Sequence, residues 1–271
     1  MLASLKRNLR AYGGMAAVVP KMFMAYSIWV WMGLFVQIIA IVILVAFWTA
    51  VYNNTTTVGG LDLQTTINYL LLAQVFAAAA AGTNVIYDIG DLMREGGIGI
   101  VLLRPVDMQG SFYVSNVVQL FIDTLLRLPL ALIGWLFFGL TLPSEPAVWL
   151  AFLVSLLLGH AVMFCFDWII GCVGFYSTEI WGLSVLRYGM GMFFSGALIP
   201  LDMMPDWLRA IATLLPFSQA LYLPVSILSG ITPLAALPRI WLLQLGYLAV
   251  LLVASRVVFG RAVRMVTVQG G

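Results

Sequence analysis

The sequence MAYSIWVWMGLFVQIIAIVILVAFWTAV, residues 24–51, decides the fold because none of its side chains is charged. A helix needs about 20 mostly apolar residues to cross the hydrocarbon core of a bilayer, and this stretch exceeds that length. Amphipathic aromatic rings favour the membrane interface, and here they lie near the two ends, at Trp29, Trp31, Trp48 and Tyr52. The stretch therefore predicts a membrane-spanning helix.

The composition extends this conclusion to the whole chain, which is 63% hydrophobic and 9% charged over 271 residues. A soluble domain carries about 25% charged residues, so a soluble protein is excluded. The chain has room for about six spans with short loops, and little room for a separate soluble domain. We therefore expect an all-α membrane protein with six transmembrane helices.

The membrane domain is expected to cover residues 24–259, with a terminal segment on either side. The six spans are predicted at residues 24–51, 67–87, 112–140, 147–176, 183–201 and 239–259. Residues 1–23 place apolar side chains three or four positions apart, which is typical of an amphipathic helix on the membrane surface. Residues 260–271 form a basic tail. Because no small-residue cleavage site follows a short apolar core, we expect the first span to be an uncleaved signal anchor.

Charge counts in the short loops predict the orientation. One side of the predicted bundle carries ten basic residues: Lys6, Arg7, Arg10, Lys21, Arg94, Arg104, Arg187, Arg256, Arg261 and Arg264. The other side carries only Arg209 and Arg239. The ten-residue side is therefore expected to be cytoplasmic, together with both termini, the loop at 88–108 and the turn at 177–187. We expect the chain to lie in the cell (inner) membrane.

The segment at residues 202–238, on the outward side, is broken by prolines and is too irregular for one span. Proline fixes φ and lacks an N–H donor, so each proline begins or ends a helix. We expect two short re-entrant helices that dip into the membrane without crossing it. Irregular backbone at that depth requires burial in protein or a cavity. The alternative is a plain surface loop.

Four ionisable residues lie inside predicted spans, where charge is costly and usually faces protein or a wet cavity. Asp123 and Arg127 are four residues apart on one helix, so they face the same way and can pair. His160 and Asp167 are seven apart and also share a face. These side chains either line a polar path for substrate or protons, or form interhelical pairs that fix packing.

The sequence contains no sign of chemistry within the chain itself. There is no phosphate-binding GxxxxGK[ST] loop, so we do not expect the chain to hydrolyse ATP. One histidine and scattered carboxylates lack the spacing of a metal site, and no polar cluster indicates a catalytic centre. We expect no metal, no catalytic residue, no cofactor bound by this chain and no nucleic-acid partner.

Two motifs on this frame resemble ABC-2-type permeases, the membrane subunits of one class of ATP-driven exporters. The outward motif is Gly196-x-x-x-Pro200-x-x-x-x-Pro205-x-Trp207, followed by Pro216 and Pro224. The second motif, GDLMREGGIGIVLLRPVD at residues 90–107, follows the second predicted span. The resemblance covers nearly the whole chain.

The resemblance implies a transport subunit rather than an enzyme. The loop at 88–108 would be a coupling helix that docks into a separate ATPase subunit. The docking residues would be Asp91, Arg94, Glu95, Arg104 and Pro105. The ATPase subunit, not this chain, would bind ATP and Mg. The helix at 1–23 would be a connecting helix along the inner surface. The short outward helices would cover the exit of the translocation path.

The resemblance also implies an assembly in the lipid membrane. Two permease chains, identical or related, would form the translocation path as a dimer with two ATPase subunits. The alternatives are a membrane-embedded lipid-modifying enzyme and a stand-alone secondary transporter. The first lacks a polar catalytic cluster, and the second lacks an evident inverted repeat.

Overall fold

The computed structural model describes residues 27–81, 83–177 and 179–265, and these are almost entirely helical, with no strand among them. The long helices are α2 (Ser27–Tyr52), α7 (Met108–Phe138), α8 (Pro146–Gly171) and α13 (Leu237–Ala262). The shorter helices are α3 (Leu63–Val75), α4 (Ala78–Ala81), α5 (Val85–Arg94), α6 (Ile98–Leu102), α9 (Trp181–Phe194), α10 (Asp206–Leu214), α11 (Phe217–Ala220) and α12 (Tyr222–Leu228). The 3-10 turns are η1 (Cys172–Phe175), η2 (Leu201–Met203), η3 (Leu234–Ala236) and η4 (Val263–Met265).

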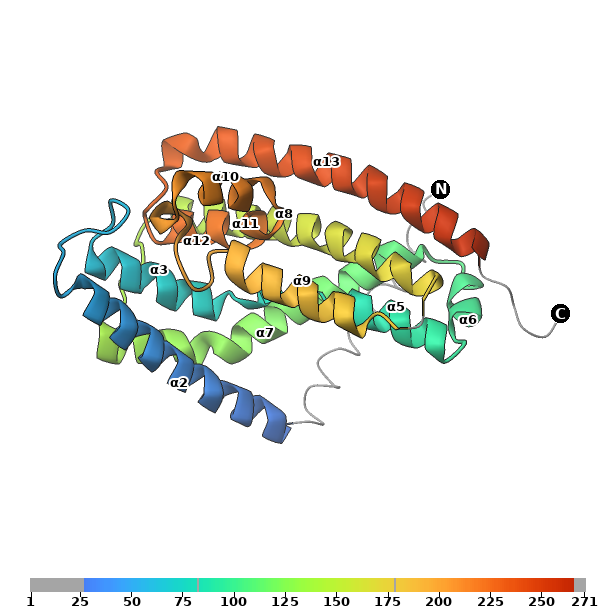
Figure 1. Ribbon diagram of the computed structural model, residues 1–271, viewed down its shortest axis with the longest axis horizontal. Helices are drawn as coiled ribbons and strands as arrows, with labels where there is room; N and C mark the ends of the chain where they lie inside the picture. The colour runs from blue at the N-terminus through green and yellow to red at the C-terminus, as the bar shows by residue number, and fades with distance from the viewer. Residues whose placement is uncertain (1–26, 82, 178, 266–271) are drawn as a thin grey trace.

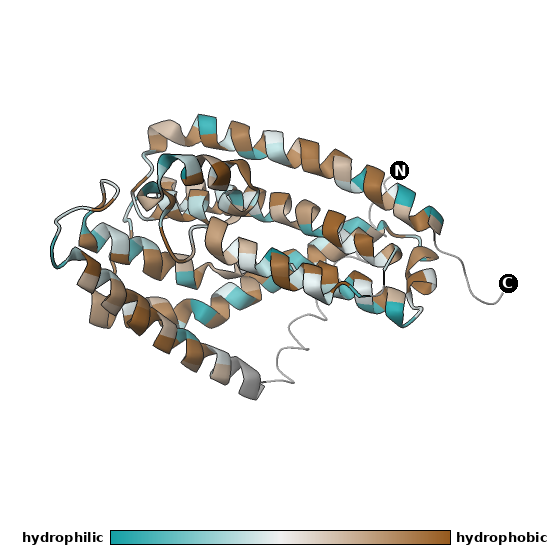
Figure 2. Cartoon of the chain, in the orientation of Figure 1, coloured by the Kyte–Doolittle hydropathy of each residue, from teal (hydrophilic) through white to brown (hydrophobic). Residues whose placement is uncertain are grey.

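Helix α8 is the centre of the bundle, packed against α13, α11, α12 and α5 (Figure 1). Its most apolar window is 61% buried, whereas the corresponding windows of α2, α7 and α13 are only 17%, 17% and 11% buried. The residues of those three helices are nevertheless hydrophobic along most of their length (Figure 2). An apolar surface of this extent suits lipid or another membrane protein rather than water.

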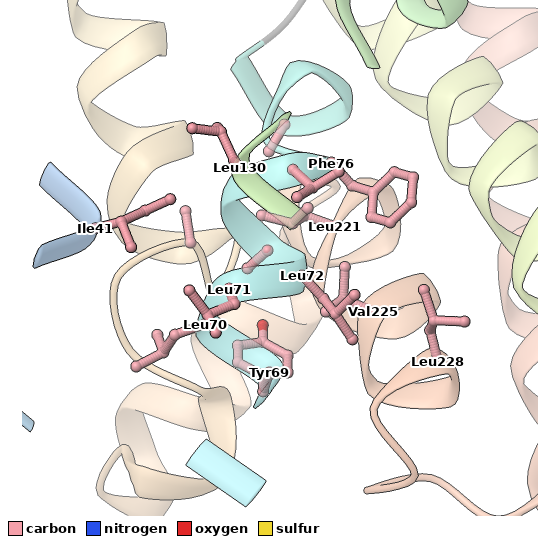
Figure 3. Close-up of a cluster of buried hydrophobic side chains, with 14 of the residues drawn as sticks. Ile41, Tyr69, Leu70, Leu71, Leu72, Phe76, Leu130, Leu221, Val225 and Leu228 are labelled. Atoms are coloured by element: carbon pink, nitrogen blue, oxygen red, sulfur yellow. The ribbon is translucent and has the colours of Figure 1, made fainter. Parts of the chain in front are cut away.

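The largest apolar core surrounds α3 (Figure 3). Tyr69, Leu70 and Leu71 on α3 are 2% exposed or less, and Ile41 from α2 and Leu130 from α7 pack against the same cluster. This core fixes the loops that join these helices at one end of the bundle. We call this end of the bundle the α12 end, and we call the opposite end, where α6 lies, the α6 end.

Four of the six predicted spans are continuous helices long and apolar enough to cross a membrane, namely the first, third, fourth and sixth. The second, predicted at 67–87, is instead divided into α3, α4 and α5 by breaks after Val75 and after Ala81. The fifth, predicted at 183–201, contains only α9. Its 14 residues span about 21 Å at 1.5 Å per residue, short of a 30 Å core.

The expected connection at 177–187 is wrong in one respect that matters for the site. Helix α9 already begins at Trp181, so Arg187 lies inside it and is 4% exposed. Arg187 therefore does not belong to a loop, and it is no longer counted among the basic residues of the side expected to be cytoplasmic. The other described basic residues keep the same asymmetry between the two ends.

The predicted loop at 88–108 is also more ordered than expected. Helix α5 starts at Val85 and α6 follows it directly. The two are joined through Gly96 at φ +72°, a backbone conformation that glycine adopts without steric cost. The polar character remains, but it lies on two helices rather than on one.

The proline-rich segment forms a hairpin made of α10, a bend of 75°, and the pair α11–α12. It begins beside the loop that joins α2 to α3, since a Cβ on Gly59 would lie 2.6 Å from the Asp202 carbonyl oxygen. It ends beside the loop that joins α7 to α8, where Gly230 and Pro143 line one depression. The hairpin thus enters and leaves the bundle at the α12 end. The amphipathic helix predicted at 1–23 and the tail beyond 265 lie outside the described residues.

Candidate functional site

A buried ion pair lies at the centre of the bundle. Arg187 on α9 donates from Nε to Asp167 Oδ1 at 2.6 Å and from Nη2 to Oδ2 at 3.0 Å. Asp167 on α8 is fully buried. Two parallel bonds of this kind are the strongest geometry available to an arginine and a carboxylate. Asp167 is therefore paired with Arg187 and not with His160.

The same pair satisfies the backbone where the second span is broken. Thr83 donates its backbone N–H and its hydroxyl to Asp167 Oδ2 at 2.8 and 3.1 Å. The Ala80 carbonyl accepts from Arg187 Nη1 at 3.2 Å. A helix break away from water leaves backbone groups without partners. The ion pair supplies those partners, which explains how the break between α4 and α5 is tolerated.

The tip of the hairpin reaches this pair. The Arg187 guanidinium carbon lies 5.6 Å from the centre of the Phe217 ring at the start of α11, within the range of a cation–π contact. Beside it, Gly159 lies so close that a Cβ there would be 2.0 Å from the Gln219 carbonyl oxygen. Gln244 on α13 donates to that carbonyl and to the Ser155 carbonyl, both at 3.0 Å. The tip is thus attached to α8, α9 and α13 together.

A polar cavity of about 420 Å³ lies next to the ion pair, between α5, α7, α8 and α9. Small-molecule sites commonly measure 300–1,000 Å³. Its polar and charged lining comes from all four helices and the break before α5: Thr83, Asn84, Tyr87, Asn116, Gln119, Asp123, Arg127, His160, Ser184, Arg187 and Tyr188. The cavity is a candidate binding site by its size and its lining.

Three of the four ionisable residues predicted inside spans line this cavity. Asp123 accepts from Gln119 Nε2, at 3.1 Å to each carboxylate oxygen. Arg127 lies one turn further along α7, yet the four ion pairs among the described residues do not join it to Asp123. Its Nη1 is buried without a hydrogen-bond partner. The pairing that the spacing allows is therefore not a direct ion pair, although the two charges still attract each other.

His160 forms the deep wall of the cavity and is 3% exposed. Neither ring nitrogen makes a hydrogen bond within accepted geometry, although the Asn116 carbonyl lies near it. Its ring stacks on Tyr113 at 6.2 Å between centroids. The histidine is thus held by packing, and the Asn116 carbonyl is the protein group nearest to serve as a hydrogen-bond acceptor for it.

The second candidate surface is the α6 end. Asp91 and Arg94 form an exposed ion pair on the last turn of α5, and Glu95, Arg104 and Pro105 are also exposed. Two apolar side chains that sequence reasoning missed lie among these charges: Ile100 is 68% exposed and Leu103 is 86% exposed. Charged and apolar groups together are typical of a surface that docks a soluble protein.

A bridge across the bundle holds this surface to the last span. Asp107 caps α7 by accepting from the Gly110 N–H at 2.7 Å, and it also accepts from Arg256 Nη2 on α13 at 2.8 Å. The hydrogen bond from Arg256 lowers the pKa of Asp107. The α5–α6 region is therefore attached to a long helix at its C-terminal side.

The outward motif residues shape the hairpin. Gly196 has φ +84°, and a Cβ there would be 2.4 Å from the Tyr69 hydroxyl oxygen, which donates to the Gly196 carbonyl at 2.9 Å. Pro205 and Pro216 directly precede α10 and α11. Pro200 lies directly before η2, Trp207 is exposed on α10, and Pro224 is buried in α12. None of them lines the polar cavity.

Comparison with known families matches residues 21–270 to the family described as "ABC-2 family transporter protein". The match covers almost the whole chain. The chain belongs to the ABC-2 transporter family. A search of curated proteins finds no significant match.

Family membership confirms the resemblance seen in the two motifs. The ABC-2 chain is a multi-pass membrane protein and the permease part of an ABC-type transporter. Such permeases associate with ABC ATPases and are typically dimers. Membership indicates a transport subunit rather than an enzyme.

Proposed function

We propose that this chain is the permease subunit of an ATP-driven exporter and that its α6 end docks on a separate ATPase. The observation that carries the proposal is the exposed mixture of Ile100, Leu103 and charged side chains on α5–α6. A docking helix needs apolar groups to bury and charges to select its partner. ATP and Mg would bind to the partner, not to this chain.

Rigid attachment supports a role of this end in transmitting motion. Helix α5 packs against α8 and η1 through buried Val85, Ile86 and Ile89. Gly171 on α8 lies so near that an added Cβ would be 2.9 Å from Ile89. A push on α6 would therefore move α5 against the central helix instead of bending a loose loop.

We propose six crossings, both termini in the cytoplasm and a location in the inner membrane. The broken series α3–α4–α5 and helix α9 would supply the second and fifth crossings, and the hairpin α10–α12 would be re-entrant and cover the exit. The described charges support this orientation: Arg94, Arg104, Arg256, Arg261 and Arg264 lie toward the α6 end. Arg209 and Arg239 lie toward the other. Cytoplasmic ends are enriched in basic residues.

We also propose that two permease chains, identical or related, enclose the translocation path. Most of the apolar surface of α2 and α13 is not buried within the chain. This surface is available for such a contact and for lipid. The polar cavity of each chain would be the part of the path that contacts cargo.

Copurification from native membranes in mild detergent tests the proposal. The tagged chain should bring down a stoichiometric ABC ATPase, and the double reversal Asp91→Lys/Glu95→Lys should lose it. The matched control is Glu145→Lys, an exposed carboxylate before α8 at the α12 end, which should keep the ATPase. If the wild-type chain brings down no ATPase, or both charge variants retain it equally, the proposed docking surface is wrong.

A further inference from the structure

The polar cavity contains two opposite charges that attract each other but are not joined as an ion pair among the described residues. Asp123 and Arg127 share one face of α7 and both line the cavity. Among the described residues, only Gln119 donates a hydrogen bond to the Asp123 carboxylate, and a carboxylate has about four acceptor sites. Arg127 Nη1 is buried without a partner. Each charge therefore has free capacity for a ligand.

The other charged group at the cavity does not alter this balance. Arg187 is committed to Asp167 through two hydrogen bonds and to the Ala80 carbonyl through a third. A neutral His160 has one donor and one acceptor nitrogen. The donor can be directed to the Asn116 carbonyl, which leaves the acceptor nitrogen for a ligand. The cavity is thus neutral overall, with one negative and one positive group on adjacent turns of α7.

The rim of the cavity is formed by two amphipathic tyrosines and a valine from α5 and α9. Tyr87, Val185 and Tyr188 are 46%, 46% and 51% exposed, whereas His160 at the base is 3% exposed. Helices α7 and α9 form opposite walls and share no extensive contact. A ligand with a polar head in the cavity could therefore keep an apolar tail outside, between the two helices.

From this geometry we propose that the cavity binds the zwitterionic head group of an amphiphile, which enters sideways between α7 and α9. Arg127 would donate to the anionic oxygens of the head group, because guanidinium groups bind phosphate and carboxylate through paired donors. The Asp123 carboxylate would attract the cationic end electrostatically. A purely anionic head would leave Asp123 facing like charge, and a purely cationic head would leave Arg127 in the same position. The inference rests on the proposed transport function and names its substrate class.

Binding of three detergents with the same twelve-carbon tail tests this inference on the purified full chain in a neutral maltoside. The probes are dodecylphosphocholine, dodecyl phosphate and dodecyltrimethylammonium, measured by native mass spectrometry. Dodecylphosphocholine should bind at least about tenfold tighter than either probe whose head group carries charge of one sign only, because each of those probes leaves one of the two cavity charges without a partner. Phosphocholine without a tail should bind more weakly. Equal affinity for the three probes would overturn the proposal, and tight binding of tail-free phosphocholine would overturn the amphiphile.

Two variants assign the roles of the charges. Arg127→Gln should reduce dodecylphosphocholine binding about tenfold and shift the preference toward the cationic probe. Asp123→Asn should reduce it similarly and shift the preference toward the anionic probe. Arg239→Gln, which removes an exposed arginine of α13, should change nothing. If Arg239→Gln reduces binding as much as Arg127→Gln, the effect is not that of the cavity and the proposal is wrong.

A labelling assay leaves both charges intact in case the cavity variants do not fold. A cysteine in Tyr188→Cys stands at the rim, while the native Cys165 and Cys172 are buried. Dodecylphosphocholine should protect it from a maleimide at concentrations where the other two probes do not, and equal protection would contradict the inference. No ATPase is needed in these assays. Absence of an ATPase from the wild-type copurification would therefore refute the proposed docking, whereas failed binding of the probes would refute only the substrate class.

Discussion

Arg187 is the residue on which the centre of the protein depends. It joins α9 to α8 through Asp167, closes the helix break through Ala80 and contacts Phe217 of the hairpin. The sequence gives Asp167 as a candidate but assigns Arg187 to a loop. Because pairing across 20 residues of sequence depends on how α8 and α9 pack, helix periodicity alone could not find it. A lone arginine in an otherwise apolar segment was the available signal.

The conservative change Asp167→Asn should strongly destabilise the chain. It leaves the guanidinium of Arg187 buried without its counter-charge, which costs about 3–5 kcal/mol. Thermal unfolding in detergent, followed by loss of the monodisperse species, measures the effect. The control Asp206→Asn removes the carboxylate of an exposed pair with Arg209, and we expect a change within about 1 kcal/mol. Equal stability of the two variants would show that the central pair is unimportant.

The charges of the cavity show a second limit at the residue scale. Spacing of four residues correctly places Asp123 and Arg127 on one face of α7, and both line the cavity. The spacing does not predict that Asp123 accepts hydrogen bonds from Gln119 instead of pairing directly with Arg127. A choice between two partners on the same helix depends on rotamers and on the space beside the helix.

At the scale of elements, continuous spans were predictable and broken ones were not. The spans predicted at 24–51, 112–140, 147–176 and 239–259 correspond, over the described residues, to α2, α7, α8 and α13, because twenty apolar residues leave few alternatives. The second span is broken because Asp167 and Arg187, distant in sequence, satisfy its open backbone. No local pattern encodes that compensation.

The docking of the hairpin on α8 should depend on Gly159. Gly159→Ala would place a methyl group 2.0 Å from the Gln219 carbonyl oxygen, so the hairpin tip must move, at a cost of about 1–3 kcal/mol. The matched control is Gly246→Ala on α13, where nothing lies within 4 Å of the added group. That variant should be neutral or more stable by up to about 1 kcal/mol. Thermal unfolding of the two variants measures the difference. The same unfolding midpoint for both would show that the hairpin tip is not closely packed against α8 at Gly159.

At the scale of the whole molecule, the chain path has two chemically different ends. The α6 end carries exposed charges with Ile100 and Leu103, and the α12 end carries loops and the hairpin. Composition and charge asymmetry predicted the membrane class and this polarity. The exposed apolar side chains of α6 were not predictable, because which face of a five-residue helix is open depends on its neighbours.

Labelling from outside intact cells should reveal this polarity. Cysteines in Glu145→Cys, Asp206→Cys and Ala235→Cys, all exposed toward the α12 end, should react with an impermeant maleimide. Asp206 and Ala235 flank the hairpin, so labelling of both agrees with a re-entrant path. Glu179→Cys, exposed near the start of α9, should react only after permeabilisation. Labelling of Glu179→Cys in sealed cells would reverse the orientation, and opposite results at 206 and 235 would make the hairpin a crossing.

The most direct measurement is site-specific photo-crosslinking in native membranes with benzoylphenylalanine at Leu103, which is 86% exposed on the α6 side. We predict a crosslinked product that contains an ABC ATPase, and we expect the yield of this product to change when nucleotide is added. The same group at Leu142, 51% exposed at the α12 end, should give no ATPase product. An ATPase captured at Leu142 but not at Leu103, or at neither position, would contradict coupling through α5 and α6.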